Sequence, residues 1–161
     1  MKKIVLLLAT LLISLGVYAQ TPKKITFKPT DVISGKTIQQ HARTYDVQAY
    51  KETKTVYTSG MSETAFVNTI LSNFPSQADN QLKTCVQPYY RYIYSLHVSN
   101  LTDAQVANQT TGVELAQLIT NLHSYEIDHP GALDGMADWP WSSILKIIEK
   151  IIQIIIIILS M

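Results

Sequence analysis

The chain has 161 residues, of which 47% are hydrophobic and 16% are charged, with 13 Lys and Arg residues against 12 Asp and Glu. This length suits a single domain with a real core. The net charge of +1 argues against the broad basic surface of a nucleic-acid binder, and the composition argues against disorder throughout the chain. A single cysteine excludes a disulfide framework and a cysteine-rich zinc site.

The first 19 residues have the pattern of a bacterial secretory signal peptide. Lys2 and Lys3 form a positively charged start, Ile4 to Val17 form an apolar stretch, and Ala19 is a small residue suited to cleavage. Loss of this segment leaves 11 positive and 12 negative side chains, a net charge of −1. The sequence therefore predicts an exported protein, secreted or periplasmic and with a possible membrane association.

The charge of the remaining chain is uneven. Residues 20–60 contain seven basic and three acidic side chains, whereas residues 61–140 contain two basic and eight acidic ones. The two regions would suit pairing with each other or binding to an anionic surface. Because seven charges are spread over about forty residues, we favour the simpler interpretation of a solvated surface.

The region before Gly60 predicts a small β element. Residues 24–28 alternate in polarity and indicate at most a short strand, and residues 31–43 predict a loop or a short helix. Tyr45 to Tyr50 and Thr53 to Ser59 are rich in Tyr, Val and Thr, and they predict the two strands of a hairpin. No Asn-Gly or Asp-Gly turn supports that hairpin.

Helical periodicity follows Gly60. Ser62 is suited to cap a first helix that ends before Pro75, and apolar residues from Ala78 to Leu96 predict a second, with Pro88 as its kink. Capping boxes are predicted at Thr102–Gln105 and at Thr111–Glu114, the second opening a helix with Leu115, Leu118, Ile119 and Leu122 on one side. Residues 128–140 predict a loop.

The last segment, residues 144–159, contains ten isoleucines and two leucines. Polar residues recur at steps of three and four (Ser143, Lys146, Lys150, Gln153), which predicts one polar stripe along a helix. The predicted fold is thus mainly α (α+β), with a small N-terminal β-hairpin and about four helices. Its organisation is a signal peptide at 1–19, one domain at 20–140 and a hydrophobic, amphipathic C-terminal helix at 141–161.

Three interpretations of this C-terminal helix remain open. It is the buried helix around which the domain packs, or it lies on or in a membrane, or it pairs with another copy of the chain. Lys146, Glu149 and Lys150 in its first half argue against a membrane span. Trp139 and Trp141 before it suit either a membrane interface or a groove in a partner.

Two groups of side chains are candidates for function. The metal-site candidates combine imidazole and carboxylate groups near one helix end, with calcium as the candidate ion, and are His123, Glu126, Asp128 and Asp134. The interaction candidates are aromatic or lie on the apolar side of the last helix, and are Tyr90, Tyr94, Trp139, Trp141, Ile151, Ile155 and Ile158.

The sequence favours a small exported binding or interaction protein of a bacterial envelope, without enzymatic activity, whose C-terminal helix provides a hydrophobic contact. Its predicted partner is a protein or a second copy, with possible contact to a membrane surface and none to nucleic acid. One alternative is a secreted factor that inserts into a bilayer. Another is a metal-assisted hydrolase based on His123, Glu126 and Asp128.

Overall fold

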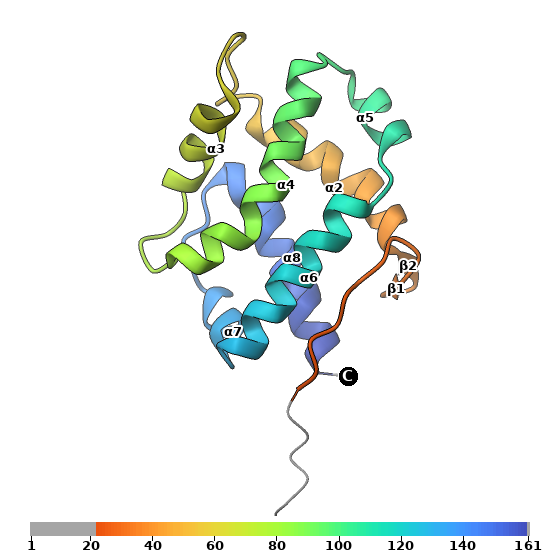
Figure 1. The fold of residues 1–161 in the computed structure, drawn as a ribbon, viewed down its shortest axis with the longest axis vertical. Helices are drawn as coiled ribbons and strands as arrows, with labels where there is room; N and C mark the ends of the chain where they lie inside the picture. The colour runs from red at the N-terminus through yellow and green to blue at the C-terminus, as the bar shows by residue number, and fades with distance from the viewer. Residues whose placement is uncertain (1–21, 161) are drawn as a thin grey trace, which may run out of the picture.

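The computed structural model describes residues 22–160, and this part of the chain is mainly helical, as predicted (Figure 1). A two-stranded hairpin, β1 (Val32–Ile33) and β2 (Lys36–Thr37), precedes the helices. The seven α-helices of the described part are α2 (Ile38–Thr53), α3 (Glu63–Ser72), α4 (Asn80–Val98), α5 (Asp103–Gln109), α6 (Val113–Asp128), α7 (Ala132–Met136) and α8 (Lys146–Leu159), and a short 3-10 helix, η1 (Ser143–Leu145), leads into α8. The predicted signal peptide lies outside the described residues.

The hairpin exists but not where the sequence predicted it. Its strands pair antiparallel, with Ile33 opposite Lys36, and its turn is Ser34–Gly35 with φ angles of 51° and 79°. Two positive φ angles match the right-handed twist of a tight hairpin. The predicted hairpin at residues 45–59 is wrong, because its first part belongs to α2 and the rest forms turns and coil. Residues 24–28 form no strand either.

A capping box explains why α2 begins at Ile38. The hydroxyl of Thr37 accepts a hydrogen bond from the Gln40 N–H at 3.1 Å, and the Gln40 side chain accepts one from the Thr37 N–H at 2.8 Å. One face of α2 is buried at helical spacing, at Ile38, Ala42 and Ala49. Residues 45–50 therefore form a helix although Tyr and Val prefer strands, because the cap at Thr37 and burial of one helix face outweigh that preference.

The other predicted helix starts have mixed outcomes. The caps at Ser62 and Thr102 are confirmed, because their hydroxyls accept from the backbone N–H groups of Ala65 and Gln105. The capping box predicted at Thr111 is wrong, because the N-cap residue of α6 is Gly112, which has a φ of 80° and provides no side-chain cap. A Cβ atom at Gly112 would lie 2.7 Å from the Gln39 Cα atom, so glycine lets α6 start directly against α2.

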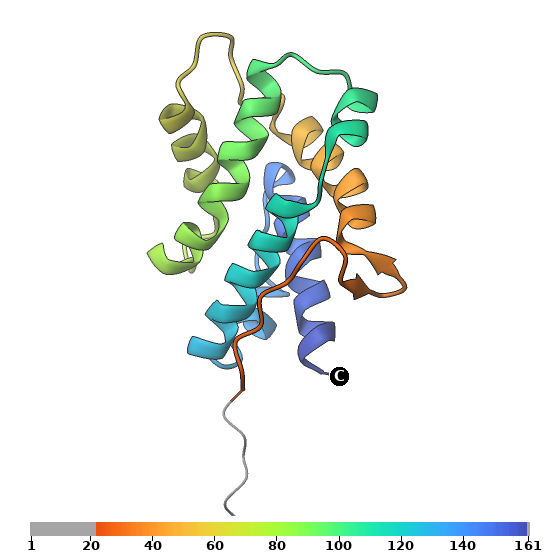
Figure 2. The same ribbon diagram turned by 45° about the vertical axis from the view of Figure 1, so that its right-hand side comes forward.

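The helix α8 packs against three of the other α-helices. The pair α4 and α6 forms the most extensive helix contact, α2 packs on α5 and α6, and α8 contacts α2, α6 and α7. Figure 2 shows α8 between α6 and the hairpin, with the segment that begins at Pro22 running along α6. The beginning of the described chain and the end of α8 therefore lie at the same end of the molecule (Figure 1).

Most of α8 is core. Its buried side chains are Ile147, Ile148, Ile151, Ile152 and Ile155. The predicted polar stripe is exposed at Ser143, Lys146, Lys150 and Gln153. No helix within residues 22–160 combines the length and the apolar character that crossing a membrane requires.

Ion pairs connect the basic and acidic regions of the chain. Lys24 pairs with Asp128 at 2.7 Å, and Lys51 and Lys54 both reach Asp103, at 3.6 and 3.2 Å. All these side chains are largely exposed, so water and salt screen the pairs and each contributes little to stability. The uneven charge is thus partly matched within the molecule, on a solvated surface.

Candidate functional site at the end of α8

The last turn of α8 places apolar side chains in solvent. The exposed stripe of Lys146, Lys150 and Gln153 continues four residues later at Ile157, which is 50% exposed. Leu159 is 40% exposed, and Val32 of the hairpin is 65% exposed. An isoleucine on the solvent stripe of a helix is not explained by core packing, so this group of exposed apolar side chains is a candidate contact surface.

A groove lies between the end of α8 and the hairpin. It has a volume of about 560 Å³, within the range of ligand-binding pockets. We call it the hairpin groove, and its lining residues are Phe27, Asp31, Val32, Ile33, Ser34, Gly35, Ile157 and Ile158. Phe27 is held there because its N–H donates to the Thr120 hydroxyl of α6 at 2.9 Å. Apart from Asp31, Ser34 and Gly35, the lining is entirely apolar.

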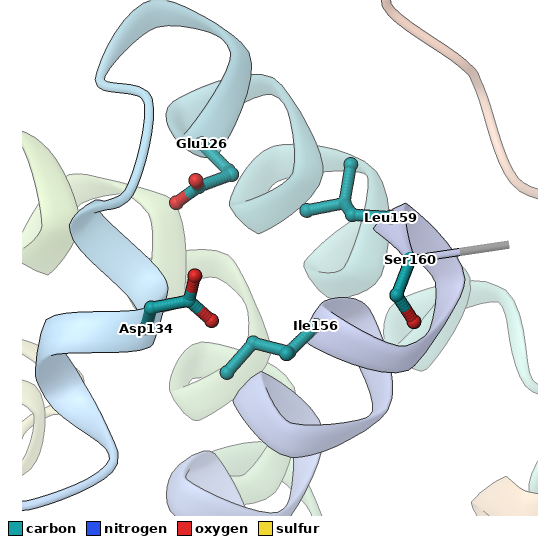
Figure 3. Close-up of a pocket in the computed structure, with 5 residues that line it drawn as sticks. All are labelled: Glu126, Asp134, Ile156, Leu159 and Ser160. Atoms are coloured by element: carbon teal, nitrogen blue, oxygen red, sulfur yellow. The ribbon is translucent and has the colours of Figure 1, made fainter.

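A second, smaller pocket of about 240 Å³ lies on the other side of the last turn of α8. We call it the acidic pocket, and it is lined by Glu126, Asp134, Ile156, Leu159 and Ser160. Figure 3 shows the two carboxylates on one side of this pocket and the side chains of Ile156 and Leu159 on the other. The exposed end of α8 therefore separates an apolar groove from an acidic pocket.

The metal-site candidates are only partly brought together. Glu126 and Asp134 line the acidic pocket, but Asp128 points to Lys24, with an Oδ2 to Nζ distance of 2.7 Å. The Glu126 carboxylate accepts from the N–H groups of Gly131 and Leu133, and so caps the start of α7. Within residues 22–160 no three His, Cys, Asp or Glu side chains gather in a way that could hold a metal ion.

His123 is separated from these carboxylates because it faces the interior. Its side chain is 2% exposed, and its ring meets the Phe27 ring edge-on at 5.6 Å between centroids. Burial lowers the pKa of His123. His123 and Glu126 therefore do not act together: the imidazole is buried, and the carboxylate accepts hydrogen bonds from the start of α7. Calcium binding by the four candidates, which the described structure does not gather into one cluster, stays a prediction that a rise in melting temperature with calcium chloride would support.

Four of the interaction candidates are core residues. Tyr90, Trp141, Ile151 and Ile155 are buried, and so they do not offer a surface to a partner. The Trp141 ring packs edge-on against Phe74, and its Nε1–H donates to the Met136 carbonyl at 3.0 Å. Tyr90 belongs to the buried face of α4, whereas Trp141, Ile151 and Ile155 are buried because α8 and the residues before it pack against the other helices.

The remaining three candidates are partly accessible. Tyr94 is half-buried, and its hydroxyl donates to the Met61 carbonyl at 2.7 Å. Trp139 is half-buried beside Trp141, with ring centroids 5.7 Å apart. Ile158 lies in the hairpin groove, and it is therefore the predicted interaction residue that the structure places in the candidate site.

Sequence reasoning missed a buried carboxylate. Asp46 of α2 is fully buried, and its oxygens accept hydrogen bonds from Tyr89 at 2.8 Å, from Tyr92 at 3.2 Å and from Thr110. Burial is the main cause that raises the pKa of Asp46 to about 6, and the charge of Glu114 adds to this effect. None of the ion pairs found among residues 22–160 includes Asp46. A helical interpretation of residues 38–53 would have placed Asp46 on the buried face.

A buried histidine lies elsewhere in the core. The His97 ring is stacked between the rings of Tyr50 and Tyr57, at 4.4 and 4.7 Å between centroids. Its Nε2 atom lies 2.9 Å from the Thr53 hydroxyl, which itself donates to the Ala49 carbonyl. Burial lowers the pKa of His97 to about 4, with a smaller contribution from the charge of Lys54.

The sequence held one signal for the hairpin groove. Ser-Gly is a turn dipeptide, and Ser34-Gly35 with Val32 and Ile33 before it indicates a hairpin. The approach of Ile157 to that hairpin is a tertiary contact without a local signal. Compared with protein-family models, curated proteins and solved structures, the chain matches none of them.

Proposed function

We propose that this protein is an exported, non-enzymatic binding protein of a bacterial envelope, and that the end of α8 and the hairpin form its contact surface. The observation that carries the proposal is the exposure of Ile157 on the polar stripe of α8, beside an apolar groove. Such a side chain stabilises the free protein little, and its transfer from water into a contact with a partner makes the free energy of binding more favourable.

The first half of α8 does not take part in this contact. Its isoleucines are already buried in the core, so the contact surface is limited to the last turn. Export is supported by the signal-peptide pattern of residues 1–19. Mass spectrometry of the secreted or periplasmic protein should find Gln20 as its first residue.

Site-specific photo-crosslinking tests the contact surface. A photoreactive amino acid replaces Ile157 in the producing cells, and a matched variant carries it at Val98, which is similarly exposed at 56% but lies at the end of α4. We expect an adduct with a polypeptide only from position 157. Adducts of equal yield from both positions, or from neither, would contradict the proposal, and an adduct with lipid would favour the membrane-active alternative.

A further inference from the structure

The charges around the end of α8 restrict what can bind there. The charged side chains that line the hairpin groove and the acidic pocket are Asp31, Glu126 and Asp134, all of them acidic. The backbone carbonyls at the C-terminal end of α8 add partial negative charge to the same region. These three carboxylates favour a positively charged group at the groove and at the pocket, whereas the exposed Lys28 and Lys36 are not part of either lining.

The positions of these charges relative to the apolar side chains are equally specific. Asp31 lines the groove that Ile157 and Ile158 border, and Asp134 lies across the last turn of α8 in the pocket that Leu159 borders. Apolar contacts thus lie between two negatively charged edges. The complementary surface has a central row of apolar side chains with basic side chains on both sides, as an amphipathic basic helix has.

Resting on the function proposed above, we infer that the end of α8 receives a basic amphipathic segment of a partner polypeptide. Its apolar side chains enter the hairpin groove against Ile157 and Phe27. Its Lys or Arg side chains lie beside Asp31 and Asp134. The Asp134 carboxylate is exposed, and the Asp31 side chain is partly exposed, so both can approach a cation without leaving water completely.

The test measures binding of a short fluorescent peptide of leucine and lysine at helical spacing to the exported protein, by fluorescence anisotropy. The comparison peptide has glutamate in place of every lysine. We expect the lysine peptide to bind and the glutamate peptide to bind at least tenfold more weakly. Raising the salt concentration from about 0.05 to about 0.5 M should weaken the lysine complex, because exposed charges are screened.

Protein variants assign the binding to this surface. We expect Ile157→Gln to weaken binding of the lysine peptide about tenfold, and Val98→Gln, at a similarly exposed position, to leave it unchanged. Asp31→Asn combined with Asp134→Asn should weaken it by roughly twofold to fivefold for each charge. Glu63→Gln, which removes an acidic side chain at the start of α3, is the matched control and should have no effect.

Several outcomes would overturn the inference. Equal affinity for the two peptides would show that charge does not select the partner. Equal affinity of the Ile157→Gln and Val98→Gln variants would place the binding elsewhere. Binding to phosphatidylglycerol vesicles without binding to the lysine peptide, or dimerisation through Ile157, would replace the inferred partner. The crosslink from position 157 still supports the proposed function if only the peptide test fails.

Discussion

The isosteric substitution Asp46→Asn separates the effect of a buried charge from the effect of side-chain shape. The carboxylate is surrounded by the hydroxyls of Tyr89, Tyr92 and Thr110, so α2 contacts α4 and the end of α5 through one ionisable group. Asparagine has the same size and keeps a carbonyl acceptor, and the hydroxyls can rotate to accept from its amide. It carries no charge at any pH.

The pKa of Asp46 gives the expected magnitude. A pKa raised from 3.8 to about 6 on folding corresponds to about 3 kcal/mol. Because the folded pKa is the higher one, this stabilisation is complete below pH 3.8 and is lost as the pH rises through 6. At pH 7.5 the folded protein therefore carries an ionised, buried Asp46 at that cost, whereas at pH 3.5 it does not.

Urea unfolding of the wild type and of Asp46→Asn between pH 3.5 and 7.5 measures this effect. We expect the stability of the variant relative to the wild type to increase by about 3 kcal/mol across that range, with the midpoint of the change between pH 4 and 6. Titrations of other groups cancel in the difference between the two proteins. A difference that does not depend on pH would refute the reasoning that Asp46 is ionised while buried.

Further predictions concern other positions. His97→Gln should reduce the loss of stability on acidification. The neutral ring, with its folded pKa of about 4, stabilises the fold above pH 6.5. This contribution, up to about 3 kcal/mol, is lost as the pH falls towards 4. Gly112→Ala should lower the free energy of unfolding in urea by about 2–4 kcal/mol, because it combines a positive φ with a clash against the Gln39 backbone. Gly131→Ala, at a φ of 82° with open space around it, should lower it by only about 1–2 kcal/mol. Equal losses in the two variants would refute the clash. Truncation after Trp141 should abolish the cooperative thermal transition, because it removes the buried face of α8; a retained transition would show that α8 is not core.

Local signals explain the parts of the fold that could be predicted. Ser62 and Thr102 cap helices through hydrogen bonds to residues three positions later, so the sequence alone contains both partners. The Thr37–Gln40 capping box is equally local, and it was available as a signal for α2. The Tyr- and Val-rich residues that follow indicated strands instead, and periodicity over such short segments does not distinguish a helix from a strand.

The candidate site was far less predictable. The metal candidates appeared close in sequence, but the structure turns His123 into the core and uses Glu126 to cap α7. His123 packs against Phe27, which is distant in the sequence. Glu126 caps α7, a helix that the sequence predicted as a loop. Asp31 and Ile157 lie far apart in the sequence, and only packing of α8 against the hairpin brings them to one groove.

The sequence by itself determined that the chain is mainly helical, where several helices begin, and which stripe of the last helix is polar. Those properties depend on spacing and capping within a few residues. Only the tertiary structure decided which isoleucines of the last helix are covered. The reason is that burial depends on which elements pack on each face: α2, α6 and α7 pack on one side of α8, and Ile157 stays in solvent beside the hairpin groove.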